Sequence, residues 1–224
     1  MTIGIAVCLA DGALLIADGK KSELSPKSRI VKDDTDKIRR IGKTVGAITL
    51  GIDIVTNTVV NILKRDNVID STCSSPEEIM REIERIMAAN WNCYLRNLPS
   101  VIDRNQMYMR AGLLVGGFVG DINFISGVLF RPDAHESPKI ETQPLTCIVL
   151  GGEEHNSQSI FEECIKKLSE ELQKKGNNEE LQISSLISAG VLTIKIVEDK
   201  DPTFGGKIKC VTIRRGLLYC ESFV

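Results

Sequence analysis

Thr2, directly after the initiator Met1, is the residue whose type and position suggest chemistry most strongly. A small second residue generally allows an aminopeptidase to remove the methionine, which leaves threonine at the N-terminus. Such a threonine combines a hydroxyl nucleophile with an α-amine of ordinary pKa about 7.7–8.0. That amine can act as the general base for its own hydroxyl. Many proteins begin Met-Thr, so the prediction of an N-terminal nucleophile depends on the rest of the chain.

Other chemistries have weaker support. The two histidines, His135 and His155, lie in polar stretches that we predict to be loops, so we expect no histidine-based triad and no metal site. The pair Gly116-Gly117 lies inside a strand pattern rather than before a helix, which argues against a phosphate-binding loop. We therefore expect the protein to use no cofactor and no metal.

The composition predicts one globular domain, residues 1–224, in the cytoplasm. Acidic and basic residues nearly balance at a net charge of -2, which argues against a nucleic-acid partner. Seven cysteines without a CxxC pair, mostly in apolar runs, indicate reduced core thiols. We expect no signal peptide and no apolar run long enough to cross a membrane.

Hydrophobic patterning in the first half predicts two hairpins followed by two helices. The turns are expected at Asp11-Gly12 and at Gly42-Lys43, and Gly51 is expected to end a strand and precede a helix. Ser75-Pro76 is typical of a capped helix start. The predicted strands are residues 1–10, 13–17, 37–41 and 44–50, the helices are 52–64 and 76–94, and residues 20–36 are predicted to be irregular.

The second half repeats this order with strands, two helices and a final hairpin. The predicted strands are residues 111–119, 122–130, 146–150, 195–197, 207–214 and 217–223, the helices are 160–176 and 179–193, and 201–206 is a loop. Because antiparallel hairpins dominate and each helix pair can cover one sheet face, the pattern favours an α+β fold with two stacked sheets between helical layers.

Four features together resemble a known family. A strand beginning with threonine opens the chain, Asp18-Gly19 ends the second strand, Lys37-Ile38 opens the third, and a strand-Gly51-helix junction follows the fourth. This set resembles the β-type proteasome subunits and their bacterial relatives, the HslV peptidase and the Anbu-type homologues. These are N-terminal nucleophile (Ntn) hydrolases, so the resemblance implies a four-layer αββα sandwich. Lys37-Ile38-Arg39-Arg40 is most similar to HslV.

The resemblance implies a role for each of five catalytic positions. Thr2 matches the nucleophile, and Lys37 matches the lysine whose ammonium favours the reactive form of the threonine. Asp18 matches the carboxylate that holds this lysine, and Asp201 matches a supporting carboxylate. Gly51 matches the glycine whose backbone N–H donates to the oxyanion near a helix N-terminus.

The resemblance also implies a binding site for an extended peptide. Ser22 matches the position whose backbone pairs with the substrate as an added strand. The side-chain pocket is expected near Lys21, Thr35, Thr49 and Asp53. Asp53 would favour a basic substrate side chain, or it is an ordinary aspartate in the first turn of a helix.

Taken one at a time, these residues have ordinary structural interpretations. Asp18 can cap the turn before Gly19, Lys37 can be an exposed lysine at a strand start, and Gly51 can be a helix-junction glycine. Asp201 can begin an Asp-Pro turn, and Ser22 can lie in a plain loop.

Two hydroxyls of the family pattern are replaced. Many members carry a Gly-Ser-Gly after a central strand, where this chain has Gly151-Gly152-Glu153-Glu154. A serine usually precedes the paired glycines of the late loop, where this chain has Phe204. The stretch from Asp18 to Lys37 is also slightly longer than usual. These hydroxyls normally orient the threonine amine and relay protons, so the departures bear on rate and substrate choice.

The resulting hypothesis is a threonine protease that hydrolyses peptide or protein substrates within a self-compartmentalised homo-oligomer, a ring or spiral, with an ATPase as a candidate partner. One alternative is a proteasome-like assembly subunit with weak or no activity. Another is a small-molecule amidase on the same fold.

Overall fold

Two five-stranded antiparallel sheets form the centre of the fold in this computed structural model. The structure describes residues 2–25, 28–32, 36–98, 109–152, 155–175 and 179–223. Sheet I has the strand order β10-β1-β2-β11-β12 and contains β1 (Gly4–Leu9), β2 (Gly12–Ala17), β10 (Cys147–Leu150), β11 (Lys209–Arg214) and β12 (Leu217–Phe223). Sheet II has the strand order β5-β6-β7-β8-β9 and contains β5 (Ile38–Arg40), β6 (Val45–Gly51), β7 (Ala111–Val119), β8 (Ile122–Phe130) and β9 (His135–Glu141).

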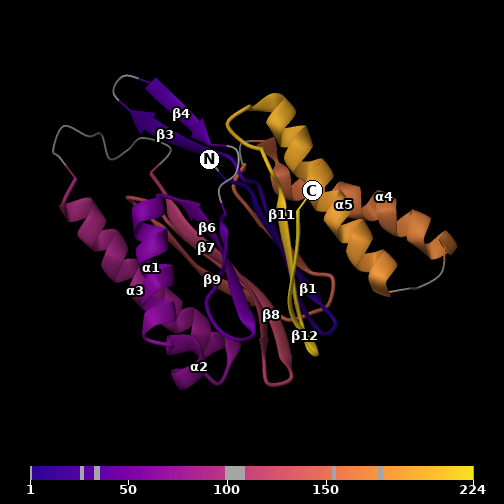
Figure 1. Cartoon of the computed structure of the whole chain (residues 1–224), viewed down its shortest axis with the longest axis horizontal. Helices are drawn as coiled ribbons and strands as arrows, with labels where there is room; N and C mark the ends of the chain where they lie inside the picture. Colours follow the sequence, from indigo (N-terminus) through magenta and orange to yellow (C-terminus); the bar gives the residue numbers. More distant parts are fainter. Residues whose placement is uncertain are drawn as a thin grey trace.

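Helices cover the outer face of each sheet (Figure 1). Sheet II carries α1 (Asp53–Arg65), α2 (Val68–Thr72) and α3 (Pro76–Arg96), and sheet I carries α4 (Ser157–Lys175) and α5 (Glu179–Lys200). A separate hairpin of β3 (Lys21–Ser25) and β4 (Ser28–Lys32) lies at the end of the sheets near the N-terminus (Figure 1).

The side chains of β1 show how the layers arise from the sequence. Ile5 and Val7 pack toward α4 and α5, whereas Ala6 and Cys8 pack toward sheet II. Side chains alternate between the two faces of a strand, so a strand buried on both faces needs a continuous apolar run. The opening run of the chain meets this requirement, and all residues of β1 are buried.

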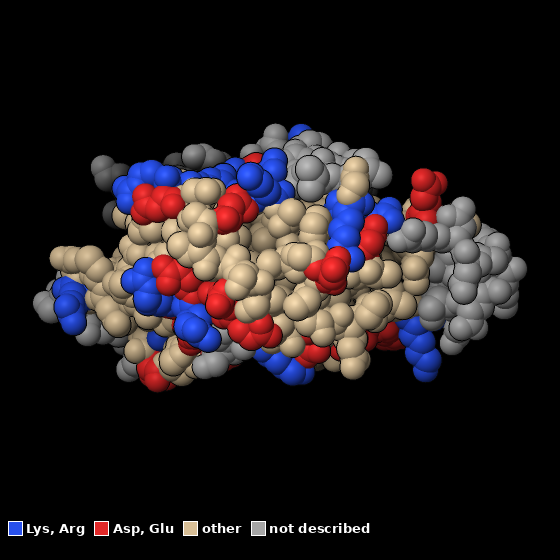
Figure 2. Space-filling model, turned by 90° about the horizontal axis from the view of Figure 1, so that it is seen from below, with Lys and Arg blue, Asp and Glu red and all other residues tan. Residues whose placement is uncertain are grey.

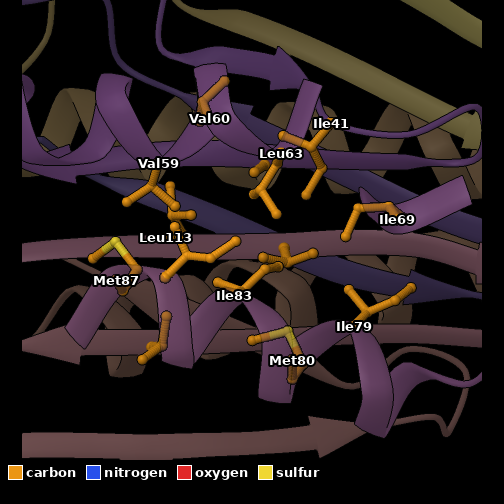
Figure 3. Packing of buried hydrophobic residues seen from close by; sticks show 14 of the residues in the cluster. Ile41, Val59, Val60, Leu63, Ile69, Ile79, Met80, Ile83, Met87 and Leu113 are labelled. Atoms are coloured by element: carbon orange, nitrogen blue, oxygen red, sulfur yellow. The ribbon is translucent and has the colours of Figure 1, made fainter. Parts of the chain in front are cut away.

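A second apolar layer lies between sheet II and its helices. Side chains from α1, α2 and α3 converge over Leu113 of β7 (Figure 3). The N-terminus of α3 is capped as predicted, because the Ser75 hydroxyl accepts a hydrogen bond from the Glu78 N–H at 3.3 Å. Trp91 belongs to the same layer, and its indole Nε1–H donates to the Arg131 carbonyl at 3.2 Å.

Most predicted elements are confirmed, with four corrections. Residues 20–36 were predicted to be irregular, but they contain the hairpin of β3 and β4. Among the described strands, these two short strands pair only with each other. Residues 195–197 continue α5 instead of forming a strand, because Ile194 and Val197 stay on the helix face that packs on sheet I. The short helix α2 and the edge strand β9 lack a clear hydrophobic period, and the sequence did not indicate either.

One helix differs from the expectation that no apolar run could span a membrane. The segment of α5 from Glu180 to Lys200 is long and apolar enough by length and composition alone. Its buried residues include Leu186, Ala189 and Val197, which pack against sheet I beside α4. These contacts bury one side of the helix, and 39% of its most apolar window is buried.

The buried thiols lead to a first prediction. Burial, aided by Glu141, raises the pKa of Cys8 to about 11, and burial raises the pKa of Cys210 to about 12. Because the thiolate is the species that reacts, we expect iodoacetamide at about pH 8 to modify the exposed Cys93 but not Cys8 or Cys210 in the folded protein. Peptide mass mapping before and after denaturation measures this. Rapid labelling of Cys8 without denaturant would contradict it.

Candidate active site

A buried ion pair between Asp18 and Lys37 bridges the two sheets. The Lys37 Nζ lies 2.9 Å from Asp18 Oδ1, with side-chain exposures of 6% and 0%. Asp18 directly follows β2 of sheet I, and Lys37 directly precedes β5 of sheet II. Lys37 also donates to the Lys20 carbonyl. The interpretation of Lys37 as an exposed strand-start lysine is therefore wrong.

The Asp18 carboxylate is tied to the backbone as well. Its Oδ1 accepts from the Ile3 N–H at 3.0 Å, and its Oδ2 accepts from the Gly205 N–H at 3.2 Å. Burial raises the pKa of Asp18, while the Lys37 ammonium and the Ile3 N–H lower it, and the net direction is upward. Asp18 thus does more than cap a turn, because it connects the start of β1, the start of β5 and the loop after α5, residues 201–206, which we call the late loop.

Thr2 lies at this junction. It is buried, with 8% of its surface exposed, and its peptide bond to Ile3 supplies the N–H that Asp18 accepts. On the other side, the Thr2 carbonyl oxygen lies against Gly151, where a Cβ atom would be only 1.8 Å away. Gly151 has φ +90°, a conformation that glycine adopts readily. The start of the chain is therefore held between Asp18 and the turn at Gly151.

Gly51 ends β6 with its N–H on the side of Lys37. The Thr49 N–H donates to the Lys37 carbonyl at 2.9 Å. Because N–H groups two residues apart in a strand point to the same side, the Gly51 N–H also projects toward the Lys37 edge of β6. Gly51 has φ +79°, and the next N–H, that of Ile52, donates to the Arg110 carbonyl. This orientation is compatible with the predicted role of Gly51 as an oxyanion donor.

Asp201 stands at the end of α5 and shapes the late loop. Its Oδ1 accepts from the Thr203 N–H at 2.9 Å, so it does form an Asp-Pro turn. Its Oδ2 lies 3.5 Å from His155 Nε2. Partial burial on its own would raise the pKa of Asp201. The Thr203 N–H and His155 lower the pKa by more than burial raises it, so that the pKa lies below its ordinary value.

The predicted substrate-binding residues are only partly placed. Ser22 and Lys21 lie in β3 rather than in a loop, with Ser22 opposite Val31 of β4. Among the described strands β3 pairs only with β4, which leaves its other edge outside the sheets. The Lys21 side chain and Thr35 lie outside the described part of the chain. Thr49 is buried and its hydroxyl donates to the Lys37 carbonyl, whereas Asp53 is half-buried in the first turn of α1.

The structure adds groups around the site that sequence reasoning missed. His155, predicted to lie in a polar loop without a role, contacts Asp201, and the buried Ser157 donates from Oγ to the Gly151 carbonyl at 2.7 Å. Phe204 is fully buried in the apolar layer under sheet I. The only sequence signal for His155 and Ser157 is that they closely follow Gly151-Gly152. Glu153 and Glu154 lie outside the described residues.

The charge distribution gives no continuous basic surface on the face drawn in Figure 2, where acidic and basic side chains are interspersed. Among the described residues, no group of three or more His, Cys, Asp or Glu side chains is arranged to hold a metal ion. A comparison of the sequence with protein-family models and with curated proteins finds no match.

Proposed function

We propose that this protein is a threonine peptidase that uses Thr2 as its nucleophile after removal of Met1. The observation that supports the proposal most is the buried ion pair of Asp18 and Lys37. Its Asp18 carboxylate accepts a hydrogen bond from the Ile3 N–H, which belongs to the peptide bond that follows Thr2. A buried ion pair is costly to desolvate and a weak source of stability, so its place beside a candidate nucleophile favours a functional use.

In this mechanism the Thr2 Oγ attacks the carbonyl carbon of an amide substrate, and the Thr2 α-amine accepts the hydroxyl proton. The C–N bond then breaks, and the departing amine takes that proton. Water hydrolyses the remaining ester and frees Thr2. Lys37 lowers the pKa of the threonine groups, Asp18 holds Lys37, and the Gly51 N–H stabilises the oxyanion.

The proposal extends to fold family and assembly. The helix-sheet-sheet-helix layering is compatible with the αββα sandwich of Ntn hydrolases of the proteasome type. An extended peptide would add along the free edge of β3, between Ser22 and the Gly51 end of β6. We also propose a cytoplasmic homo-oligomer, a ring or spiral, for which an ATPase is a candidate partner.

The test is the intact mass of the purified protein with and without an epoxyketone or β-lactone. We expect loss of Met1 and one covalent adduct in the wild type, no adduct in Thr2→Ala, and a retained adduct in Thr2→Ser. A processed chain that forms no adduct would contradict the proposal. A retained Met1 would also contradict it, because the α-amine would be blocked.

The second candidate is a proteasome-like assembly subunit without turnover. Phe204 favours it, because a fully buried ring stands where the family pattern has a serine hydroxyl. For this candidate we expect a stable oligomer in solution and no adduct at Thr2. Sizing by light scattering beside the mass measurement separates the two.

A further inference from the structure

His155 contacts Asp201 across two loops, and the proposed mechanism gives it no role. The His155 Nε2 lies 3.5 Å from Asp201 Oδ2, and about one fifth of each side chain is exposed. His155 belongs to the turn after β10, where its N–H donates to the Gly152 carbonyl at 2.9 Å. Asp201 begins the loop after α5. The contact therefore connects two segments that are remote in sequence.

One of these segments contacts the peptide bond between Thr2 and Ile3 directly, and the other reaches it through Asp18. In the turn after β10, Gly151 lies in close contact with the Thr2 carbonyl oxygen. The late loop reaches the other side through the Gly205 N–H, which donates to Asp18, the acceptor of the Ile3 N–H. Contact between His155 and Asp201 thus closes a ring of chain segments around the peptide bond between Thr2 and Ile3.

Two buried polar atoms beside Asp201, His155 Nε2 and Thr203 Oγ1, make no hydrogen bond of standard geometry within the part of the chain that the structure describes. Both side chains nevertheless interact with the Asp201 carboxylate and lower its pKa. A buried polar atom without a well-formed hydrogen bond is costly, so folded proteins keep few of them. The ring of Phe204 packs edge-on against the imidazole, with centroids 6.0 Å apart and planes at 89°, and so limits its orientation. The cluster is polar, partly exposed and incompletely bonded.

We propose that His155 is a positioning residue for Thr2, which acts through Asp201 to hold the two loops against the start of β1. The inference rests on the proposed function of Thr2. Among the described residues, the Asp201 carboxylate is the charged group that contacts the imidazole. Glu198, the next acidic side chain of α5 on this side, contacts Lys20 and the Gly206 N–H.

The rate of adduct formation at Thr2, followed over time by intact mass, tests this role. We expect His155→Phe to react about tenfold more slowly, because misorientation of a reacting group costs rate. His155→Gln, which keeps a donor, should recover part of the rate. Asp201→Asn should give a similar loss, with no further loss in the double variant.

His135→Phe is the matched control, because it makes the same substitution at the exposed histidine that contacts Glu84 on α3. It should leave the rate unchanged. If the wild type forms an adduct and His155→Phe keeps the wild-type rate, this inference is overturned and the proposed function stands. A change in melting temperature alone overturns it in the same way. If the processed wild type forms no adduct, both fail together. Should His155→Phe not fold, His155→Gln and Asp201→Asn decide the question.

Discussion

Replacing Lys37 by methionine is expected to lower the free energy of unfolding by about 3–5 kcal/mol, because it leaves a buried carboxylate without its counter-charge. Methionine nearly preserves the length of the side chain but supplies no charge and no donor. Among the described residues, Asp18 would keep as donors the backbone N–H groups of Ile3 and Gly205. Urea denaturation followed by circular dichroism measures the loss. The Thr2 adduct should disappear in the same variant.

The loss should depend on pH. Burial already raises the pKa of Asp18, and removal of the Lys37 ammonium, which lowers it, raises it further. A carboxyl group whose pKa is raised by folding contributes stability below its unfolded pKa and loses that contribution as the pH rises through its folded pKa. Relative to the wild type, Lys37→Met should therefore be least destabilised near about pH 4 and most destabilised at neutral pH.

Two variants make this prediction specific. Lys43→Met places the same substitution on the exposed turn between β5 and β6, where we expect a change within about 0.5 kcal/mol. Asp18→Asn combined with Lys37→Met should cost less than the sum of the two single changes, because it removes both charges. Additive costs would mean that the two charges do not stabilise each other.

Gly151→Ala is expected to displace Thr2 and to lower the free energy of unfolding by about 3 kcal/mol or more. The added Cβ would lie 1.8 Å from the Thr2 carbonyl oxygen, and φ +90° is unfavourable for alanine. Either β1 or the turn must therefore move. We expect the variant to form no Thr2 adduct even at temperatures where it remains folded, as judged by circular dichroism and intact mass.

Gly120→Ala separates the clash from the backbone strain. Gly120 also has positive φ, +54°, in the turn between β7 and β8, but a Cβ atom added there would meet no described atom within 4 Å. Its cost should be about 1–2 kcal/mol, the cost of the left-handed conformation alone. Equal losses in the two variants would show that the contact with Thr2 is unimportant for stability.

Local signals in the sequence predicted most elements. The strands β7 and β8 have the predicted limits, because long aliphatic runs flank a Gly-Asp turn. The capped start of α3 is predictable from Ser75 and Pro76, whose effects act within one helical turn. Elements without such signals were missed. The hairpin of β3 and β4 is polar, and β9 pairs at the edge of sheet II with an irregular register.

The sequence by itself determined which residues are candidates for chemistry. These candidates lie at the ends of strands and at junctions between elements, where side chains and backbone groups are available for a site. They are Thr2, Asp18, Lys37, Gly51 and Asp201. The tertiary structure alone decided how they meet. Asp18 and Lys37, 19 residues apart, pair only because sheet I stacks on sheet II. Likewise, His155 reaches Asp201 only because the fold brings the turn after β10 and the loop after α5 together. Hydrophobic and turn patterns act over a few residues, whereas these contacts depend on how whole layers pack.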